Sequence, residues 1–371
     1  MNKRLQMKTY KNLWENLISD QNICIAIKDY ARGRKDRPKV LFMSEHPEQF
    51  CEYYRTLAEN YIPPKHTPVK IKDGIRQKER EIIVPKMDEQ IIHHMIVNVF
   101  KPIVMKSLYE YTYGSVPNRG IKSAKEVIQK WIQTDKKNVK YCLKLDIHHY
   151  FQSVDHTILK QKLSQKISDN KFLGLCDKII NSETGIPLGF YTSQWFSIFY
   201  LNELDHKIKQ GMYAPHYIRY VDDLVIFGAN KRKLHKTWIS ISNYLEHIGL
   251  SLNNKCQLFR FDYITHGTHK GRFLDFLGCK FYRDRITMRK SIFHKMITKA
   301  KRLSKKQEPT FYESRQMLTY IGWIKMLDIH NSCVKYIYSR ISMKQLRMIV
   351  SEYDKRKGLK SCHSSFTKYL N

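Results

Sequence analysis

The hydrophobic pattern of residues 10–62 predicts helices, because apolar residues recur there at intervals of three and four positions. These positions are Leu13, Leu17, Phe50, Tyr54 and Leu57. A basic joint from Lys28 to Lys39 separates the two groups. We therefore expect an N-terminal helical region over residues 1–62.

Prolines at positions 63, 64 and 68 then stop any helix, and residues 69–84 alternate in a way that predicts a β-hairpin with basic faces. Asp88 is placed to cap a helix with a wide apolar face that extends to Phe100. A loop rich in turn residues follows at 113–120, and the spacing of 121–131 predicts another helix.

Residues 140–147 alternate as a strand, with Tyr141, Leu143 and Leu145 on one face and Asp146 at its end. A helix capped around residues 153–156 is expected next, and Thr192 and Ser193 are expected to cap a helix after the glycine loop 185–189.

Later in the chain, residues 234–248 have the spacing of an amphipathic helix, residues 249–255 suggest a strand and turn, and residues 276–282 suggest a short strand. Helices and strands mix without strict alternation, so the predicted class is α+β.

Two adjacent carboxylates interrupt the apolar run Tyr217–Phe227, which otherwise predicts a tight hairpin. On a straight strand neighbouring side chains point to opposite faces, whereas at a turn Asp222 and Asp223 can face one cavity. Such a pair repels unless a cation neutralises it, and Mg²⁺ prefers oxygen ligands. The alternative is an ordinary hairpin turn, where Asp is also common.

Charge sets the class of partner: 66 Lys and Arg against 34 Asp and Glu leave a formal +32, which favours a polyanion. From about residue 286 basic residues crowd a helical pattern, as expected of a separate basic lobe. No apolar run approaches the ~20 residues of a membrane span. The first residues lack the pattern of an export signal, and the eight cysteines include no C-x-x-C pair, so a cytoplasmic location is expected.

Five segments in this order resemble the palm motifs of reverse transcriptases. They are Lys144-Leu-Asp-Ile-His-His-Tyr-Phe-Gln-Ser-Val-Asp-His156, Gly185-Ile-Pro-Leu-Gly-Phe-Tyr-Thr-Ser-Gln194, Tyr220-Val-Asp-Asp223, Gly249 to Lys255 and Phe276-Leu-Gly278. The resemblance covers residues 65–285 and extends to the flanks only by analogy. Within the family, the chain is similar to bacterial enzymes of retroelements and anti-phage defence, and to those of diversity-generating retroelements.

The resemblance implies a right-hand polymerase, with fingers and palm over residues 63–285 and a basic helical thumb over 286–371. It implies an RNA-directed DNA polymerase, a nucleotidyltransferase that joins dNTPs on an RNA template. Asp146, Asp222 and Asp223 match the catalytic triad, which would hold two Mg²⁺ ions, or Mn²⁺, about 4 Å apart.

Other positions match residues that contact substrate. Phe151 matches the aromatic that excludes a 2′-OH, Arg80 and Lys78 match residues that bind the triphosphate, and Lys255 matches a lysine proposed to assist the leaving group. Leu188, Gly189 and Gln194 belong to the matching loop. That loop departs from the common pattern, because Leu188 stands where many members have glutamine. A similar apolar replacement accompanies error-prone copying in diversity-generating enzymes. Defence-associated enzymes also carry the Ser193-Gln194 pair in place of Ser-Pro, so this loop does not separate the two groups.

Several biological roles remain open at this point. We favour anti-phage defence with a dedicated non-coding RNA as template, on the basis of the charge and the compact chain. The alternatives are diversification of a target gene, an inactive RNA-binding scaffold and a nucleotide cyclase, although the basic C-terminal lobe would be unexplained in a cyclase. A protein partner or a homo-oligomer also remains open.

Overall fold

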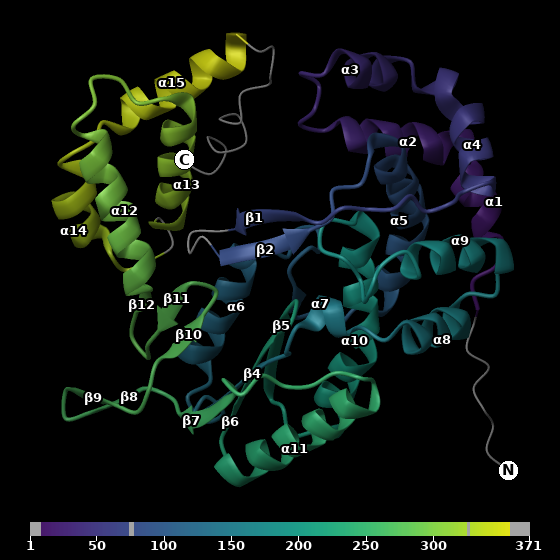
Figure 1. Cartoon of the computed structure of the whole chain (residues 1–371). Helices are drawn as coiled ribbons and strands as arrows, with labels where there is room; N and C mark the ends of the chain where they lie inside the picture. The colour runs from purple at the N-terminus through teal and green to yellow at the C-terminus, as the bar shows by residue number, and fades with distance from the viewer. Residues whose placement is uncertain (1–8, 74–77, 325–326, 357–371) are drawn as a thin grey trace, which may run out of the picture. The chain divides into compact units, whose positions relative to one another are not determined.

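The computed structural model describes residues 9–73, 78–324 and 327–356, and it divides the chain into two compact units. The first unit comprises Met1–Lys72, Glu79–Val127 and Asp135–Phe259. The second comprises Asp73–Lys78, Ile128–Thr134 and Arg260–Asn371. Helices and strands are mixed in both, which confirms the predicted α+β class (Figure 1). The boundaries predicted at residues 62 and 285 for the polymerase subdomains stay predictions.

Short helices form the N-terminal region, as predicted. They are α1 (Leu13–Ile18), α2 (Asp20–Ala31), α3 (Pro38–Glu45), η1 (Pro47–Phe50) and α4 (Cys51–Glu59). Ser19 caps α2 by accepting a hydrogen bond from the backbone N–H of Asn22. The expected basic joint is shorter than predicted, since Lys28 lies inside α2 and α3 already begins at Pro38.

The long helix α5 (Met87–Ser107) packs against α2 and α10 (Tyr191–Gly211) in the core of the first unit. Its cap differs from the prediction: Lys86 is the N-cap residue, and Asp88 instead accepts a hydrogen bond of 2.8 Å from the Tyr54 hydroxyl. Thr192 and Ser193 likewise do not cap α10. Its N-cap residue is Phe190, and both Thr192 and Ser193 are buried in its first turn. In both cases tertiary packing uses a side chain that local sequence would assign to capping.

Other elements of this part of the chain either precede α5 or lie between α5 and α10. They are β1 (Val69–Asp73), which pairs with β2 (Lys78–Ile82), then α6 (Ile121–Thr134), α7 (Tyr150–Ser153), α8 (His156–Lys166) and α9 (Asn170–Ile180). Asp155 caps α8 by accepting a 2.9 Å hydrogen bond from the N–H of Ile158, as the sequence predicts.

A five-stranded sheet carries the acidic residues, in the order β3-β5-β6-β4-β7. Its strands are β3 (Thr112–Tyr113), β4 (Tyr141–Asp146), β5 (His216–Tyr220), β6 (Asp223–Gly228) and β7 (Gln257–Arg260). Strand β3 is parallel to β5, whereas β6 pairs antiparallel with both neighbours. Helix α10 contacts β5, and α11 (Lys231–His247) contacts β4 and β6, so the sheet lies on a helical layer.

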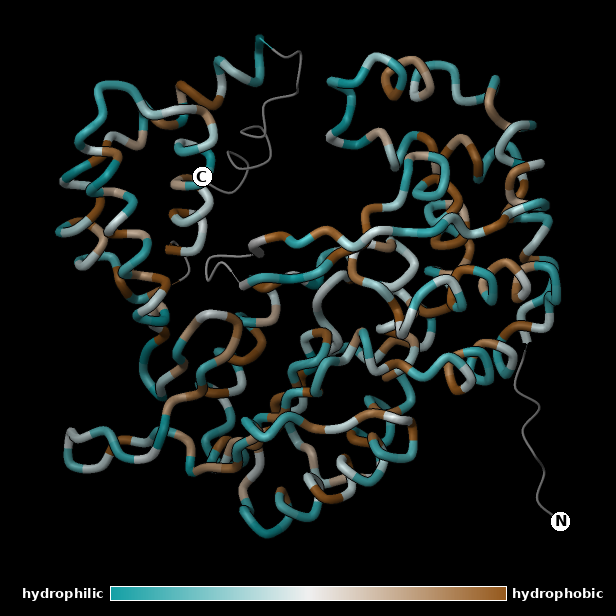
Figure 2. Tube along the Cα trace, viewed as in Figure 1, coloured by the Kyte–Doolittle hydropathy of each residue, from teal (hydrophilic) through white to brown (hydrophobic). Residues whose placement is uncertain are grey.

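The central strands of the sheet are apolar, which allows helices to cover them. Residues 224–228 of β6 are all buried. Along the helices, apolar and polar positions alternate, shown brown and teal in Figure 2. Of the strand and turn predicted at 249–255, the turn forms at residues 254–255, whereas the strand is reduced to an isolated bridge between Leu252 and Ile147. Among the described residues, no helix has the length and apolar character needed to cross a membrane.

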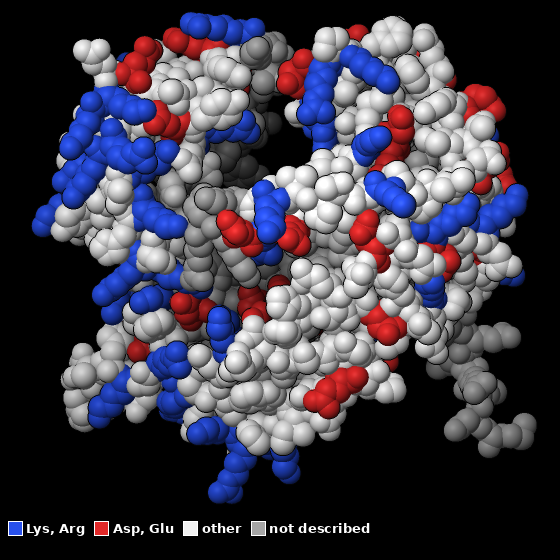
Figure 3. Space-filling view, viewed as in Figure 1, with Lys and Arg blue, Asp and Glu red and all other residues white. Residues whose placement is uncertain are grey.

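The second unit combines small hairpins with helices. Its strands are β8 (Tyr263–Thr265), β9 (Thr268–Lys270), β10 (Leu274–Phe276), β11 (Cys279–Phe281) and β12 (Ile286–Met288). Its helices are α12 (Lys290–Leu303), α13 (Phe311–Ile324), α14 (His330–Cys333), the π-helix η2 (Val334–Tyr338) and α15 (Met343–Arg356). Residues 276–282, predicted as one strand, instead form a hairpin turning at Leu277 and Gly278, both with positive φ. Lys and Arg side chains gather over the helices of this unit (Figure 3).

Candidate active site

The predicted hairpin forms, with one carboxylate in its turn and the other at the start of the following strand. Strands β5 and β6 pair up to Tyr220 opposite Asp223, which leaves Val221 and Asp222 as the two turn residues. Asp222 and Asp223 are both half-buried, as expected of groups that face a solvent-accessible site. The sequence therefore predicted the hairpin correctly, but of the two acids expected at its turn only Asp222 lies there, since Asp223 already pairs within β6.

Asp146 joins this pair through the register of the sheet. It ends β4 directly opposite Asp223 of β6, and directly opposed residues of an antiparallel pair share one face, with Cβ atoms about 4.5–5.5 Å apart. The backbone N–H of Ile147 donates to the carbonyl oxygen of Asp222 at 3.2 Å. Sheet pairing thus brings the three predicted acids to one edge of the sheet.

The backbone of Asp146 is held in place by Asn253 and Cys256. The N–H of Asn253 donates to the carbonyl oxygen of Asp146 at 2.7 Å, and the Sγ of Cys256 lies 3.4 Å from the N–H of Asp146. Burial raises the pKa of the Cys256 thiol, so this contact involves a neutral side chain. Lys255 is exposed on the same turn, and its N–H donates to the Asn253 side chain at 3.1 Å.

The donor set of the triad fits a divalent cation. Three carboxylates on one sheet edge supply the oxygen ligands that Mg²⁺ prefers, with room left for water and phosphate oxygens. Without a cation the like charges repel each other, and rotation of the side chains lets them separate. We therefore expect these carboxylates to draw together when a cation binds.

In the part of the chain that the structure describes, the three side chains whose ligand atoms all lie within 4.8 Å are a different group, Asp262, His269 and Asp284. Nδ1 of His269 lies 3.0 Å from each carboxylate oxygen of Asp262. Nη1 of Arg285 lies 2.9 Å from Oδ2 of Asp284. Both carboxylates of this group therefore already have partners within the protein.

Phe151 and the glycine loop are held together by backbone contacts. The carbonyl oxygen of the half-buried Phe151 accepts a hydrogen bond of 2.8 Å from the N–H of Ile186. Gly185 has φ 61, and a Cβ there would lie 2.5 Å from the same carbonyl oxygen, so only glycine fits this approach. The structure thus packs the loop of Leu188 against the segment that carries Phe151.

The same loop lies against the chain that follows β2. The N–H of Ile83 donates to the carbonyl oxygen of Leu188 at 2.8 Å, and a Cβ on Gly189 would lie 1.9 Å from the Ile83 carbonyl oxygen. Gln194 is exposed in the first turn of α10. Arg80 is exposed on β2, and the side chain of Lys78 lies outside what the structure describes.

A polar cavity of about 640 Å³ lies beside this loop, lined by residues 152–156, 181–185 and 249. Glu183 on its wall accepts from Nδ1 of the buried His66 at 2.9 Å, while Nε2 of His66 lies 2.9 Å from Glu89. Burial opposes protonation of His66, but the hydrogen bonds to Glu89 and Glu183 outweigh it and raise its pKa.

Three residues that support the acids were not predicted from the sequence. Cys256 directly follows Lys255 and touches the backbone of Asp146. Arg219 and Asp205 form a fully buried ion pair beneath the turn. The available signal was a charged residue at a buried position: Arg219 stands in the apolar hairpin run, and Asp205 follows Leu204 on the apolar face of α10.

Comparisons with known proteins agree with this arrangement. Residues 64–281 match the family model described as reverse transcriptase (RNA-dependent DNA polymerase). Retron Ec73 reverse transcriptase of Escherichia coli is 25% identical over 307 residues, which cover 77% of this chain and 88% of that protein. Protein YkfC of Escherichia coli (strain K12) is 24% identical over 162 residues, covering 40% of this chain and 42% of that protein.

Among solved structures, the apo telomerase of Candida tropicalis is similar, with 14% identity and a TM-score of 0.49. The match covers 87% of this chain, and the chain spans 63% of that telomerase. At this score the likeness adds nothing to the assignment, which rests on the family model and on the motifs placed above. The sequence resemblance to bacterial reverse transcriptases and the right-hand polymerase fold are thereby confirmed, and the chain belongs to the reverse transcriptase family, the RNA-dependent DNA polymerases.

Proposed function

We propose that the chain extends a DNA strand on an RNA template, with the reaction centred on Asp146, Asp222 and Asp223. The observation that carries this proposal is the register of β4, β5 and β6, which sets Asp146 opposite Asp223 beside the turn that bears Asp222. Two bound Mg²⁺ ions would supply activation of the primer 3′-OH and charge stabilisation of the departing pyrophosphate.

The other residues would select and orient the substrate. The half-buried Phe151, anchored through its carbonyl to the glycine loop, is suited to contact the sugar and exclude a ribonucleotide. Arg80 and Lys78 on β2, and Lys255 near Asp146, would offer fixed positive charge to a triphosphate. Leu188, Gly189 and Gln194 would border the nascent base pair.

Substitution of Asp222 by asparagine tests the site, because it removes a ligand charge while keeping the volume of the side chain. We expect no detectable dNTP incorporation in a primer-extension assay with Mg²⁺, and unchanged binding of a primer-template measured in EDTA. Asp36→Asn, in an exposed loop, is the matched control and should extend normally. Normal extension by Asp222→Asn would refute the assignment and would favour a scaffold role for the fold.

For the biological role we propose anti-phage defence with a dedicated non-coding RNA as template. One relative carries the name of a retron, and the formal charge of +32 exceeds what a short primer-template would engage. Binding through phosphates should weaken with salt by a slope of about −0.7 to −0.9 per contact. Diversification of a target gene is the competing role, and a cytoplasmic location and a protein partner or homo-oligomer stay predictions.

Sequencing the RNA that remains on the purified protein after a high-salt wash tests this role. One dominant RNA encoded near the gene is expected. A heterogeneous mixture of cellular RNAs would refute a dedicated template, and template repeats beside a variable-protein gene would favour diversification. Neither result depends on the outcome for Asp222→Asn, since binding and catalysis are measured separately.

A further inference from the structure

The turn that carries Asp222 holds a backbone conformation that its sequence disfavours. Val221 has φ 57 and occupies the first position of the two-residue turn between Tyr220 and Asp223. Turns with positive φ at this position usually have glycine there, and a β-branched residue with positive φ is rare. Such strain persists only where surrounding contacts hold it.

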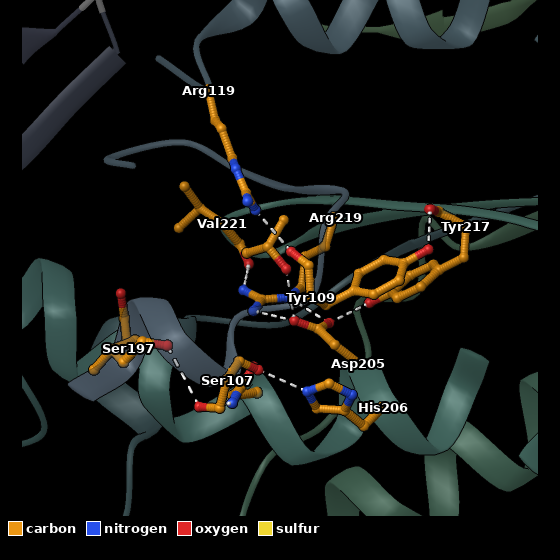
Figure 4. A network of polar contacts seen from close by, with 12 residues as sticks. Ser107, Tyr109, Arg119, Ser197, Asp205, His206, Tyr217, Arg219 and Val221 are labelled. Carbon is orange, nitrogen blue, oxygen red and sulfur yellow. Dashed lines mark hydrogen bonds and ion pairs between the residues drawn. The ribbon is translucent and has the colours of Figure 1, made fainter. Parts of the chain in front are cut away.

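Contacts on both sides hold this turn. The N–H of Val221 donates to the carbonyl oxygen of Tyr113 at 3.1 Å, and the Val221 side chain fills the space beside Gly114, where a Cβ would lie 2.6 Å from it. On the other side, Nη1 of Arg219 donates to the carbonyl oxygen of Val221 at 2.9 Å. Figure 4 shows this guanidinium lying between the Val221 carbonyl and the carboxylate of Asp205.

Asp205 fixes the guanidinium in that position. Nε of Arg219 donates to Oδ1 at 2.7 Å and Nη2 donates to Oδ2 at 2.5 Å, a two-point contact that sets the plane of the group. The hydroxyls of Tyr217 and Thr112 donate to the same two oxygens at 2.6 and 2.9 Å. Every contact in this set is buried, so the arginine has little freedom to turn away.

The consequence reaches the metal-binding carboxylate through the backbone. A peptide unit is planar, so fixing the Val221 carbonyl oxygen fixes the N–H of Asp222 and the direction of its Cα. The peptide after Asp222 is fixed as well, because its carbonyl oxygen accepts from the N–H of Ile147. Asp222 is thus held from both sides, once by Arg219 and once by the strand that carries Asp146.

We propose that Arg219, oriented by Asp205, is a positioning residue that holds the Asp222 carboxylate in the geometry needed to bind the catalytic cation. The inference rests on the proposed role of Asp222 as a metal ligand. Arg219 makes no contact with substrate in this role; it acts through the Val221 peptide. Because Mg²⁺ demands near-ideal coordination geometry, a displaced Asp222 should weaken cation binding before it weakens nucleic-acid binding.

The test is a Mg²⁺ titration of primer extension by Arg219→Lys. Lysine keeps the charge beside Asp205 but cannot bond the carboxylate at two points and the Val221 carbonyl at once. We expect the half-saturating Mg²⁺ concentration to rise about tenfold and the maximal rate to fall about 10- to 100-fold, as for a small misplacement of a reacting group. Binding of the primer-template in EDTA should be unchanged.

Arg55→Lys is the matched control, since Arg55 also pairs with two carboxylates, those of Asp20 and Glu52, but lies on α4. It should leave the Mg²⁺ titration unchanged. If Asp222→Asn is inactive while Arg219→Lys titrates like the unmodified protein, the positioning role is refuted and the proposed function stands. If Asp222→Asn is active, the proposed function itself fails.

If Arg219→Lys does not fold, Thr112→Val carries the test. This change keeps the side-chain volume and removes one donor to Asp205, so a smaller rise of about two- to threefold in half-saturating Mg²⁺ is expected. An unchanged titration would refute the proposal. Lower activity that merely follows a lower folded fraction, without a shift in the titration, would also refute it.

Discussion

Alanine in place of Gly189 tests whether the glycine loop must approach the chain after β2 as closely as the structure shows. Gly189 has φ 109, and an added Cβ would lie 1.9 Å from the carbonyl oxygen of Ile83. That distance is far below van der Waals contact, and the atom it would meet belongs to the backbone rather than to a flexible side chain. Either the loop or the Ile83 segment must therefore move.

Three costs combine in this variant. A side chain at positive φ costs roughly 1–2 kcal/mol, and overpacking of a fixed site costs typically about 1–3 kcal/mol. Movement also breaks the 2.8 Å hydrogen bond from Ile83 N–H to Leu188, worth about 1 kcal/mol. We expect the free energy of unfolding to fall by about 3–6 kcal/mol.

Urea unfolding followed by tryptophan fluorescence measures this loss, and steady-state extension measures its effect on catalysis. Because Ile83 directly follows the strand that carries Arg80, we expect kcat/KM for dNTP to fall at least about tenfold. Gly174→Ala is the control: Gly174 lies inside α9 with nothing within 4 Å of an added Cβ, so alanine should stabilise by about 0.5–1 kcal/mol. Unfolding and kinetics of Gly189→Ala that match those of the unmodified protein would refute the close approach.

Two further predictions address other parts of the first unit. Phe151→Val should admit ribonucleotides, and rNTP incorporation no higher than in the unmodified protein would leave Phe151 with a packing role only. Burial lowers the pKa of His93 to about 3. As the pH falls below about 6.5, His93 therefore binds a proton in the unfolded chain but stays neutral in the folded chain. The free energy of unfolding should therefore fall by about 2 kcal/mol between pH 7.5 and pH 5 on this account. His93→Leu should lose that part of the pH dependence, and an unchanged slope would show that His93 titrates normally.

The sequence predicted the elements that local pattern determines. The hairpin of β5 and β6 was predictable because β-branched and aromatic runs flank the acids at short range, and the Asp155 cap because it lies three residues from its partner. Asp88 and Thr192 were wrongly expected to cap helices, since packing against Tyr54 and burial in α10 decide their environment. Local preference is outweighed wherever a side chain meets a partner from a distant part of the chain.

The residues that support the site could not be predicted from the sequence for the same reason. Arg219 and Asp205 lie on a strand and a helix whose contact follows only from the fold, and Cys256 reaches Asp146 only because residues after α11 return to the end of β4. The motif residues Leu188 and Gly189 were predicted, but their neighbour Ile83 was not. A motif is identified by its own residues, whereas the contacts that hold it in place come from distant parts of the chain.

The dependence of the acids on sheet register explains why buried apolar residues matter for catalysis. Asp146 faces Asp223 only while β4 and β6 keep their pairing, in which Leu145 opposes Leu224 and Leu143 opposes Ile226. A slip of one residue would turn every side chain of β6 to the other face and carry Asp223 away from Asp146. All four of these apolar side chains are fully buried, so a slip would lose the packing that now surrounds them. The core therefore fixes the spacing of the carboxylates, and Arg219 has only to fix the one acid that lies beyond the paired strands.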